Sequence, residues 1–395
     1  MKKTIDDLKL KGKKVLIRVD FNVPIKNGVI TSNKRIVAAL PTIQKVVDDH
    51  GKVILFSHLG RIKEQADLAK NDLFPVSIEL AKLLKRPVRF VDETRGKELE
   101  KAISEMKEQD VILVQNTRYE DLNDKSESKN NPALGEYWAS LGDVFINDAF
   151  GTAHRAHASN VGIASNIKES AIGYLMQKEV ESLNKAIENP AHPYVAIIGG
   201  AKVSDKIKVL ENLITLVDKM LIGGAMAYTF KKAQGYEVGT SLVEDDFIPF
   251  AKEFLEKHGD KVILPVDNAC AKGFEDVKPI IYGLNIDKDL MGLDIGPETI
   301  KLFTKALKGA KTVVWNGPMG VAEFENYREG TLAIAKAIAS LGSSCYSIVG
   351  GGDSVAAVEK LNMENKFSHV STGGGASLEL LQGLVLPGVA AIEEK

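Results

Sequence analysis

The stretch YVAIIGGAK at residues 194–202 decides the fold class, because a short apolar run there ends in two glycines and leads into a helix-like segment. Runs of the same kind recur along the chain, and helix-like segments follow most of them. They lie at residues 15–23, 53–60, 111–118, 144–151, 219–227, 261–267, 312–320, 346–354 and 369–377. Buried strands that alternate with helices are typical of α/β domains with parallel sheets. The sequence therefore predicts two similar sheets, one in each half of the chain.

Length and composition exclude several classes of protein. The 395 residues suffice for two or three domains, and 44% apolar with 26% charged residues is typical of a chain that folds on its own. Lys and Arg number 51 against 53 Asp and Glu, so the whole molecule has no strong attraction for nucleic acid or membranes. The two cysteines lie outside any metal-binding spacing, and the charged N-terminal segment has no signal-peptide core, so we expect a cytoplasmic protein.

The sequence also predicts the structure of three segments outside the apolar runs. Residues 178–187 are predicted to form a connecting helix that residues 189–193 end. The polar stretch 121–132 is predicted to be a surface loop without assignable chemistry. The C-terminal run LVLPGVAAIEEK is too apolar to remain in solvent, and we expect it to pack back on the first domain.

Arginine is unevenly distributed. Of nine arginines, only Arg328 lies beyond residue 155. Four are at or just beyond the carboxyl ends of apolar runs: Arg35, Arg61, Arg118 and Arg155. Ligands bind at that edge of open α/β sheets, and guanidinium prefers phosphate and carboxylate. The same edge also carries Asp20, Asn22, His58, His154 and His157. A single histidine is more often structural, but the whole set favours a small polyanionic ligand in the first half.

Glycine has the opposite distribution, with 25 of 34 residues from position 173 onward. Clusters at 199–200, 223–224, 350–352 and 373–375 follow apolar runs and favour a nucleotide, because such loops let backbone N–H groups approach phosphate. Tight turns are the alternative reading of any one cluster. Neither a GxxxxGK[ST] loop nor a dinucleotide fingerprint is present.

Two further features support a nucleotide site in the second half. Asp353 could hold Mg²⁺ against nucleotide phosphates or act only as a helix cap. Lys202 and Lys206 are expected on one face at the start of a helix, beside the first glycine turn.

Several strings resemble the phosphoglycerate kinase family over nearly the whole chain: RVDFNVP (18–24), SHLGR (57–61), NDAFGTAHRAHAS (147–159), GGAKVSDK (199–206), VWNGPMG (314–320), VGGGDS (349–354) and STGGGASLE (371–379). The resemblance implies two Rossmann-like three-layer α/β/α domains joined by a helical hinge. Residues 1–172 would bind 3-phosphoglycerate, with residues 378–395 packed on them, and residues 173–377 would bind ATP or ADP with Mg²⁺. The family is typically monomeric, so we expect a monomer, and the balanced charge predicts neither a nucleic-acid nor a membrane partner.

The resemblance also implies the site residues. Substrate binding would fall to Asp20, Phe21, Asn22, Arg35, His58, Leu59, Gly60, Arg61, Arg118 and Arg155. Nucleotide binding would fall to Gly199, Lys202, Lys206, Gly223, Gly292, Asn316, Glu323, Gly351, Gly352, Asp353 and Ser354. Arg35, Lys202 and Lys206 would be catalytic, and Asp353 would engage the metal. Departures from the usual family pattern occur at Ile62, Gln115, Ala225 and Ala322, the last two near the expected adenosine pocket.

The expected reaction is reversible phosphoryl transfer between ATP and the carboxylate of 3-phosphoglycerate, giving ADP and 1,3-bisphosphoglycerate. A carboxylate is already ionised at neutral pH, so no general base is required. One alternative is a nicotinamide-linked dehydrogenase, which the missing dinucleotide fingerprint disfavours. Another is a non-catalytic sensor of nucleotides or phosphorylated metabolites, which the presence of both Arg35 and Lys202 disfavours.

Overall fold

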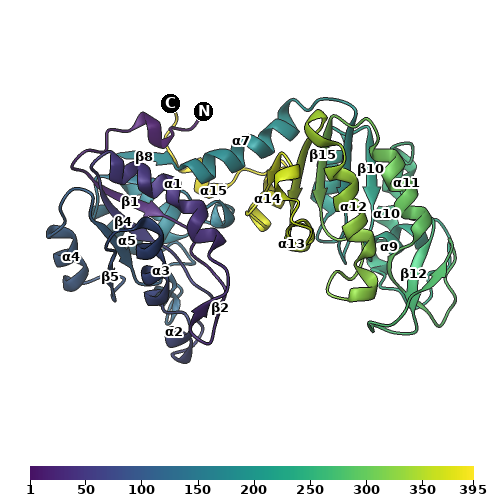
Figure 1. The fold of residues 1–395 in the computed structure, drawn as a ribbon, viewed down its shortest axis with the longest axis horizontal. Helices are drawn as coiled ribbons and strands as arrows, with labels where there is room; N and C mark the ends of the chain where they lie inside the picture. The colour runs from purple at the N-terminus through teal and green to yellow at the C-terminus, as the bar shows by residue number, and fades with distance from the viewer. The chain divides into compact units, whose positions relative to one another are not determined.

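The computed structural model describes all residues, 1–395, and divides into two compact units. One comprises Met1–Val180 together with Val385–Lys395, and the other comprises Glu181–Leu384. Each unit contains a six-stranded sheet in which all strands run parallel. Figure 1 labels the main elements of both units. The predicted α/β class with two parallel sheets is confirmed. The sequence-based boundaries, after residues 172 and 377, precede those of the compact units, which fall after Val180 and Leu384.

The sheet of the first unit has the strand order β5-β6-β4-β1-β7-β8. The strands are β1 (Lys14–Arg18), β4 (Lys52–Phe56), β5 (Arg89–Val91), β6 (Val111–Val114), β7 (Val144–Asn147) and β8 (Glu169–Ile172). In the centre, Val15 is opposite Val53 on one side and Val144 on the other. The chain extends the sheet toward β4 after β1 and toward β7 later, so the strand order reverses beside β1, where such sheets bind ligands.

Helices cover both faces of this sheet. Val15 and Ile17 share an apolar cluster with Ile43 of α1 (Lys34–Asp48) and Leu80 of α3 (Phe74–Leu84). The neighbouring strand residue Phe56 points the other way, and its ring centroid lies 5.5 Å from that of Trp138 in α5 (Pro132–Ser140). The unit is thus three-layered. Its remaining elements are β2 (Ile25–Lys26), β3 (Val29–Ile30), α2 (Ala66–Lys70), α4 (Lys97–Ser104) and α6 (Ile163–Asn166).

The sheet of the second unit has the order β11-β10-β9-β15-β16-β17, which reverses between β9 and β15. Its strands are β9 (Tyr194–Ile198), β10 (Lys219–Ile222), β11 (Val262–Ile263), β15 (Thr312–Asn316), β16 (Tyr346–Gly350) and β17 (His369–Val370). A smaller antiparallel sheet has the order β13-β12-β14, formed by β12 (Asn268–Ala271), β13 (Ile280–Tyr282) and β14 (Met291–Ile295).

Trp315 in β15 lies in an apolar cluster with Phe303 of α11 (Pro297–Leu307), Ile334 of α12 (Glu329–Ala339) and Val358 of α13 (Gly352–Lys360). The other helices of the second unit are α8 (Ile207–Ile214), α9 (Met226–Ala233), α10 (Ile248–His258) and α14 (Gly375–Leu381). No helix of the structure combines the length and the apolar composition that a membrane crossing requires.

Two segments connect or complete the units. The predicted connecting helix exists as α7 (Tyr174–Glu188), and the boundary at Val180 falls within it. The C-terminal segment, which includes α15 (Pro387–Ala390), belongs to the first unit, as expected, but only from Val385 onward. Gly388 N–H donates to Ala153 O at 2.8 Å, and Glu394 pairs with Lys2 at 2.7 Å and with the N-terminal amine at 3.1 Å.

The prediction of a surface loop at 121–132 is wrong in part. Glu127 is completely buried, and Asp121 and Ser126 are almost so. The carboxylate of Glu127 accepts hydrogen bonds from Ser159, which is why a polar stretch can enter the interior.

Candidate functional site

The carboxyl ends of four adjacent strands bring the predicted polyanion-binding residues to one edge of the first sheet. Asp20 follows β1, His58 follows β4, Arg118 follows β6, and Arg155 lies beyond β7. Arg35 joins them from the first turn of α1. Because these strands are parallel neighbours, residues far apart in sequence converge on the edge where the sequence predicted a ligand site.

Hydrogen bonds connect the loops of this edge. Arg35 Nη1 lies 2.5 Å from Asp20 Oδ2, and the side chain of Arg35 is 41% exposed. Gly60 N–H donates to Asn22 Oδ1 at 2.9 Å, while Arg118 Nη1 donates to Gly60 O at 2.5 Å. The β1, β4 and β6 loops are therefore fixed relative to one another.

Other predicted residues of this edge fall into two groups. Phe21 and Leu59 have side chains in the apolar core, so only their backbone could meet a ligand. Phe21 N–H already donates to Ser57 Oγ at 2.8 Å. Arg61 and Arg155 are exposed and make no ion pair within the protein, which leaves both guanidinium groups available to an anion.

Arg18, the last residue of β1, also lies at this edge, although it was not among the site residues predicted from the sequence. It is fully buried, and its Nη2 lies 3.2 Å from His58 Nδ1. Its Nε donates to Ser159 Oγ at 2.8 Å. The available signal was a lone cation at the end of an otherwise apolar strand, because a buried charge needs partners.

The environment keeps His58 uncharged. Burial lowers the pKa of His58 well below 6.5, and the positive charges of Arg18 and Arg118 lower it further. His157 behaves in the same way, since burial and then Arg18 lower its pKa to about 3. At neutral pH, His58 and His157 therefore add no positive charge to that of the arginines at this edge.

In the second unit, the loop after β15 lies close against the glycines that follow β9 and β10. A Cβ on Gly199 would lie 2.1 Å from Pro318 O, and one on Gly223 would lie 2.4 Å from Met319 Sδ. Gly199 N–H donates to Asn316 O at 2.9 Å. These two glycines are required by the protein's own loops, in addition to any approach of a ligand.

Lys206 extends across the same edge, and its ammonium donates to Asn316 Oδ1. Burial lowers its pKa, an effect that the nearby carboxylates of Asp205 and Asp353 oppose. The prediction that Lys202 and Lys206 share one face of a helix is wrong, because α8 begins only at Ile207. Both lysines precede the helix, in the loop that the glycine turn at Gly200 begins, and Lys202 is exposed.

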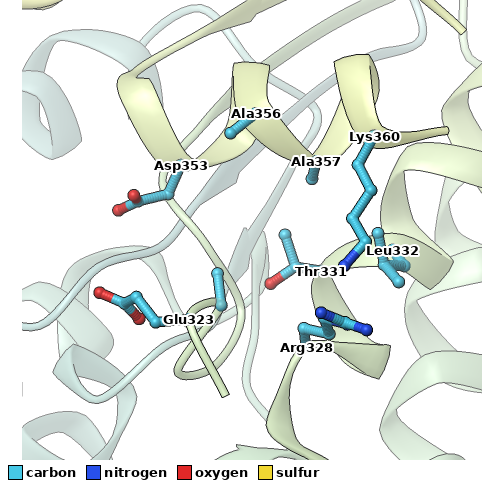
Figure 2. A pocket seen from close by; sticks show the side chains of 9 residues that line it. Glu323, Arg328, Thr331, Leu332, Asp353, Ala356, Ala357 and Lys360 are labelled. Atoms are coloured by element: carbon cyan, nitrogen blue, oxygen red, sulfur yellow. The ribbon is translucent and has the colours of Figure 1, made fainter. Parts of the chain in front are cut away.

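Asp353 and Glu323 lie at the same end of a cavity of about 170 Å³ (Figure 2). Asp353 is on the first turn of α13, after Gly351 with φ of 89°. The other lining residues are Ala322, Arg328, Thr331, Leu332, Ala356, Ala357 and Lys360. Ala322 lines the same cavity as both carboxylates, and its small side chain fills little of it.

Two residues that were predicted to bind the nucleotide, Ser354 and Gly292, also have structural roles within the protein. The hydroxyl of Ser354 is buried and accepts from Gly317 N–H at 2.8 Å, which fixes the loop after β15. Gly292 is in β14, where a Cβ would lie 2.0 Å from Tyr228 Oη.

The oxygen chemistry of this edge fits a magnesium ion that is shared with a nucleotide. No three His, Cys, Asp or Glu side chains are grouped to hold a metal by themselves. The Asp353 carboxylate is exposed beside the turn at Gly351 and Gly352. Mg²⁺ is commonly held by one or two carboxylates plus substrate phosphates, which is the arrangement these residues allow.

Comparison with known proteins gives concordant matches over the whole chain. A family model described as Phosphoglycerate kinase matches residues 5–384. Phosphoglycerate kinases of Enterococcus faecalis and Staphylococcus aureus are 60% and 59% identical over 396 aligned positions, which cover 100% of both chains. The solved phosphoglycerate kinase of Coxiella burnetii is 41% identical with a TM-score of 0.89, covering 99% of this chain and 98% of that one. For the enzyme of Pyrococcus horikoshii the identity is 31%, the TM-score 0.84 and both coverages 98%.

Proposed function

This chain belongs to the phosphoglycerate kinase family, the enzymes that transfer a phosphoryl group reversibly between ATP and 3-phosphoglycerate, and we propose how its residues divide that work. The first unit binds the phosphorylated acid through Arg35, Arg61, Arg118 and Arg155, with Asp20, Asn22 and His58. The single observation that carries this assignment is that Asp20, His58, Arg118 and Arg155 follow four adjacent parallel strands, where Arg35 joins them from α1. Phe21, Leu59 and Gly60 contribute backbone and shape.

The second unit binds the nucleotide at the edge formed by Gly199, Gly223, Asn316 and the turn Gly351–Ser354. Lys202 and Lys206 contact phosphate oxygens, Glu323 accepts from the ribose hydroxyls, and Gly292 borders the base. The burial of Lys206 supports its role, because a partly desolvated ammonium gains more from an anion than an exposed one does.

The chemistry requires charge stabilisation and positioning. The attacking carboxylate is ionised at neutral pH, so no side chain has to remove a proton. Arg35 neutralises charge on the moving phosphoryl group from the acid side, and Lys202 and Lys206 do so from the nucleotide side. Asp353 would hold Mg²⁺, which when bound neutralises charge on the phosphate oxygens.

The two ligands bind to different units, yet the carboxylate and the terminal phosphorus must react in line and in contact. Catalysis therefore includes a motion that brings the ligands together, with α7 as the hinge. Such a motion also excludes water that would otherwise hydrolyse ATP. Solution scattering with both ligands tests it, since an unchanged radius of gyration would contradict it.

The activity itself is tested by mixing the purified protein with Mg-ATP and 3-phosphoglycerate and draining the product with a coupled dehydrogenase. Turnover of about 1 to 100 per second is expected for a kinase. Binding of both ligands without turnover would instead favour a sensor. We further propose that the protein works in the cytoplasm as a monomer. Light scattering on the eluting peak of a sizing column would check the oligomeric state.

A further inference from the structure

A buried chain of hydrogen bonds links Glu127 to His58 across the first unit. Ser159 Oγ donates to Glu127 Oε1, and Ser159 N–H donates to Oε2 at 2.9 Å. Arg18 Nε donates to Ser159 Oγ at 2.8 Å. The relay, defined as Glu127, Ser159, Arg18 and His58, ends where Arg18 Nη2 meets His58 Nδ1 at 3.2 Å. Its members come from four separate regions of the sequence and are all buried.

The direction of each hydrogen bond follows from the donors available. A guanidinium has only donors, so His58 Nδ1 must accept from Arg18. The hydroxyl of Ser159 accepts from Arg18 Nε, and its own proton therefore points at Glu127, which as a carboxylate only accepts. A neutral histidine that accepts through Nδ1 carries its single proton on Nε2. The relay thus selects one tautomer of His58.

The charges of the relay support this order. Burial raises the pKa of Glu127, but the charge of Arg18 and the two bonds from Ser159 oppose that rise. Arg18 is completely buried, and its nearest carboxylate is Glu127, whose Oε1 lies 4.0 Å from Arg18 Nη2. An unpaired guanidinium would be costly in this interior, so Glu127 holds Arg18 in place as well as compensating its charge.

We propose that Glu127 is a positioning residue that acts through Ser159 and Arg18 to hold His58 as a neutral Nε2–H donor for the anionic acid substrate. The proposal deepens the function assigned above and rests on it, since His58 is taken to contact that substrate. A donor of fixed direction suits a phosphate or carboxylate oxygen, whereas the opposite tautomer would present a lone pair to an anion and repel it.

The tautomer is measured directly on the full chain, labelled with ¹⁵N-histidine and assigned with the His58→Gln variant. Long-range nitrogen–proton NMR spectra of the substrate-free protein should show His58 protonated at Nε2 only. In Glu127→Gln, the His58 nitrogens should shift toward a mixture of tautomers. A wild-type His58 protonated at Nδ1, or a spectrum that Glu127→Gln leaves unchanged, would overturn the proposal.

Kinetics gives the second readout. Losing a hydrogen bond to a charged group costs about 1.5–3 kcal/mol, so KM for 3-phosphoglycerate should rise roughly ten- to a hundredfold in Glu127→Gln. KM for ATP should stay within about twofold, because the nucleotide residues belong to the other unit. Equal rises in both values would indicate general damage and overturn the assignment.

Further variants separate the relay from stability. If Glu127→Gln does not fold, Ser159→Ala removes the hydroxyl that joins Arg18 to Glu127 and is a smaller change. Ser159→Thr, which keeps a hydroxyl, should retain the wild-type His58 spectrum. Asn131→Ala is the matched control, because Asn131 caps α5 four residues from Glu127 without touching the relay. It should lower stability by about 1 kcal/mol and leave the His58 spectrum unchanged. If His58→Gln binds 3-phosphoglycerate normally, His58 does not contact the substrate and that part of the proposed function is wrong. The NMR spectrum of His58 still tests the relay independently.

Discussion

Arg35 and Asp20 form an ion pair at 2.5 Å between the first turn of α1 and the loop after β1. A cation in the first turn opposes the helix dipole, so Arg35 is not explained by helix stability. Its guanidinium is partly exposed and is held by a single carboxylate. The pair therefore orients a cation that remains able to meet an anionic ligand.

Replacing Arg35 by alanine should abolish most of the activity and leave the fold intact. Loss of a cation that stabilises phosphoryl transfer commonly lowers kcat by about 10³- to 10⁵-fold. Arg89→Ala is the control, because Arg89 pairs with Glu105 at 2.8 Å on the surface of the same unit. A near-normal kcat for Arg35→Ala in the coupled assay would reject its catalytic assignment.

Gly352→Ala should weaken the binding of ATP without lowering the stability of the protein. A Cβ at Gly352 would meet no atom within 4 Å, and alanine favours the helix by about 1 kcal/mol, so stability should not fall. A methyl group at the phosphate turn should nevertheless raise KM for ATP roughly tenfold, a loss of about 1.4 kcal/mol. Gly283→Ala, also in open space, is the matched control. Unchanged KM for ATP in Gly352→Ala would contradict the proposed phosphate contact.

Ala322→Phe should strengthen nucleotide binding. The cavity beside Ala322, Glu323 and Asp353 is large enough to take added apolar surface (Figure 2). Burying part of an aromatic ring there is worth about 1 kcal/mol or more, so Kd for ADP should fall about fivefold in calorimetry. The Kd of 3-phosphoglycerate serves as the internal control and should not change. An unaltered Kd for ADP would show that the cavity does not border the bound nucleotide.

Asp148 makes stability depend on pH. Burial raises its pKa from 3.8 to about 7, so the folded chain retains a proton that the unfolded chain loses. This contribution is present below pH 3.8 and is lost as pH rises through about 7. Asp148→Asn removes this titration. From pH 5 to pH 8, the unfolding free energy of the wild type should therefore fall relative to that of Asp148→Asn, by about a few kcal/mol.

Denaturant titrations at several pH values measure this effect. The exposed Asp246→Asn serves as the control and should track the wild type. A difference between Asp148→Asn and wild type that stays constant with pH would contradict the prediction.

The sequence predicted the sheets and most of each candidate site because both depend on local pattern. Apolar runs mark buried strands, and in parallel sheets the residues that follow neighbouring strands must meet. His58, Arg118 and Asp353 could be found in this way, whereas Arg35 reaches the same edge from the first turn of α1. The exact start of α8 could not be predicted, because the residues after the glycine turn form a loop, although helical spacing alone would assign them to the helix.

Long-range contacts account for what was missed. Glu127 and Ser159 are 32 residues apart, and Arg18 and Ser159 are 141 apart, so no local pattern joins them. Gln115 is similar: its amide donates to Asp72 and Asp92 at 2.9 and 2.8 Å. A glutamate there would face two carboxylates, which explains the amide at this position only once the fold is known.

The first unit is not continuous in sequence, because Val385–Lys395 returns to it and Glu394 pairs with the N-terminal amine. A ribosome synthesises the residues 1–180 long before the segment that completes them. The nascent N-terminal unit therefore lacks the contact between Gly388 and Ala153 until residues 385–395 have been synthesised. The second unit, whose residues are contiguous, can finish folding first, which reverses the usual order of domain folding during synthesis.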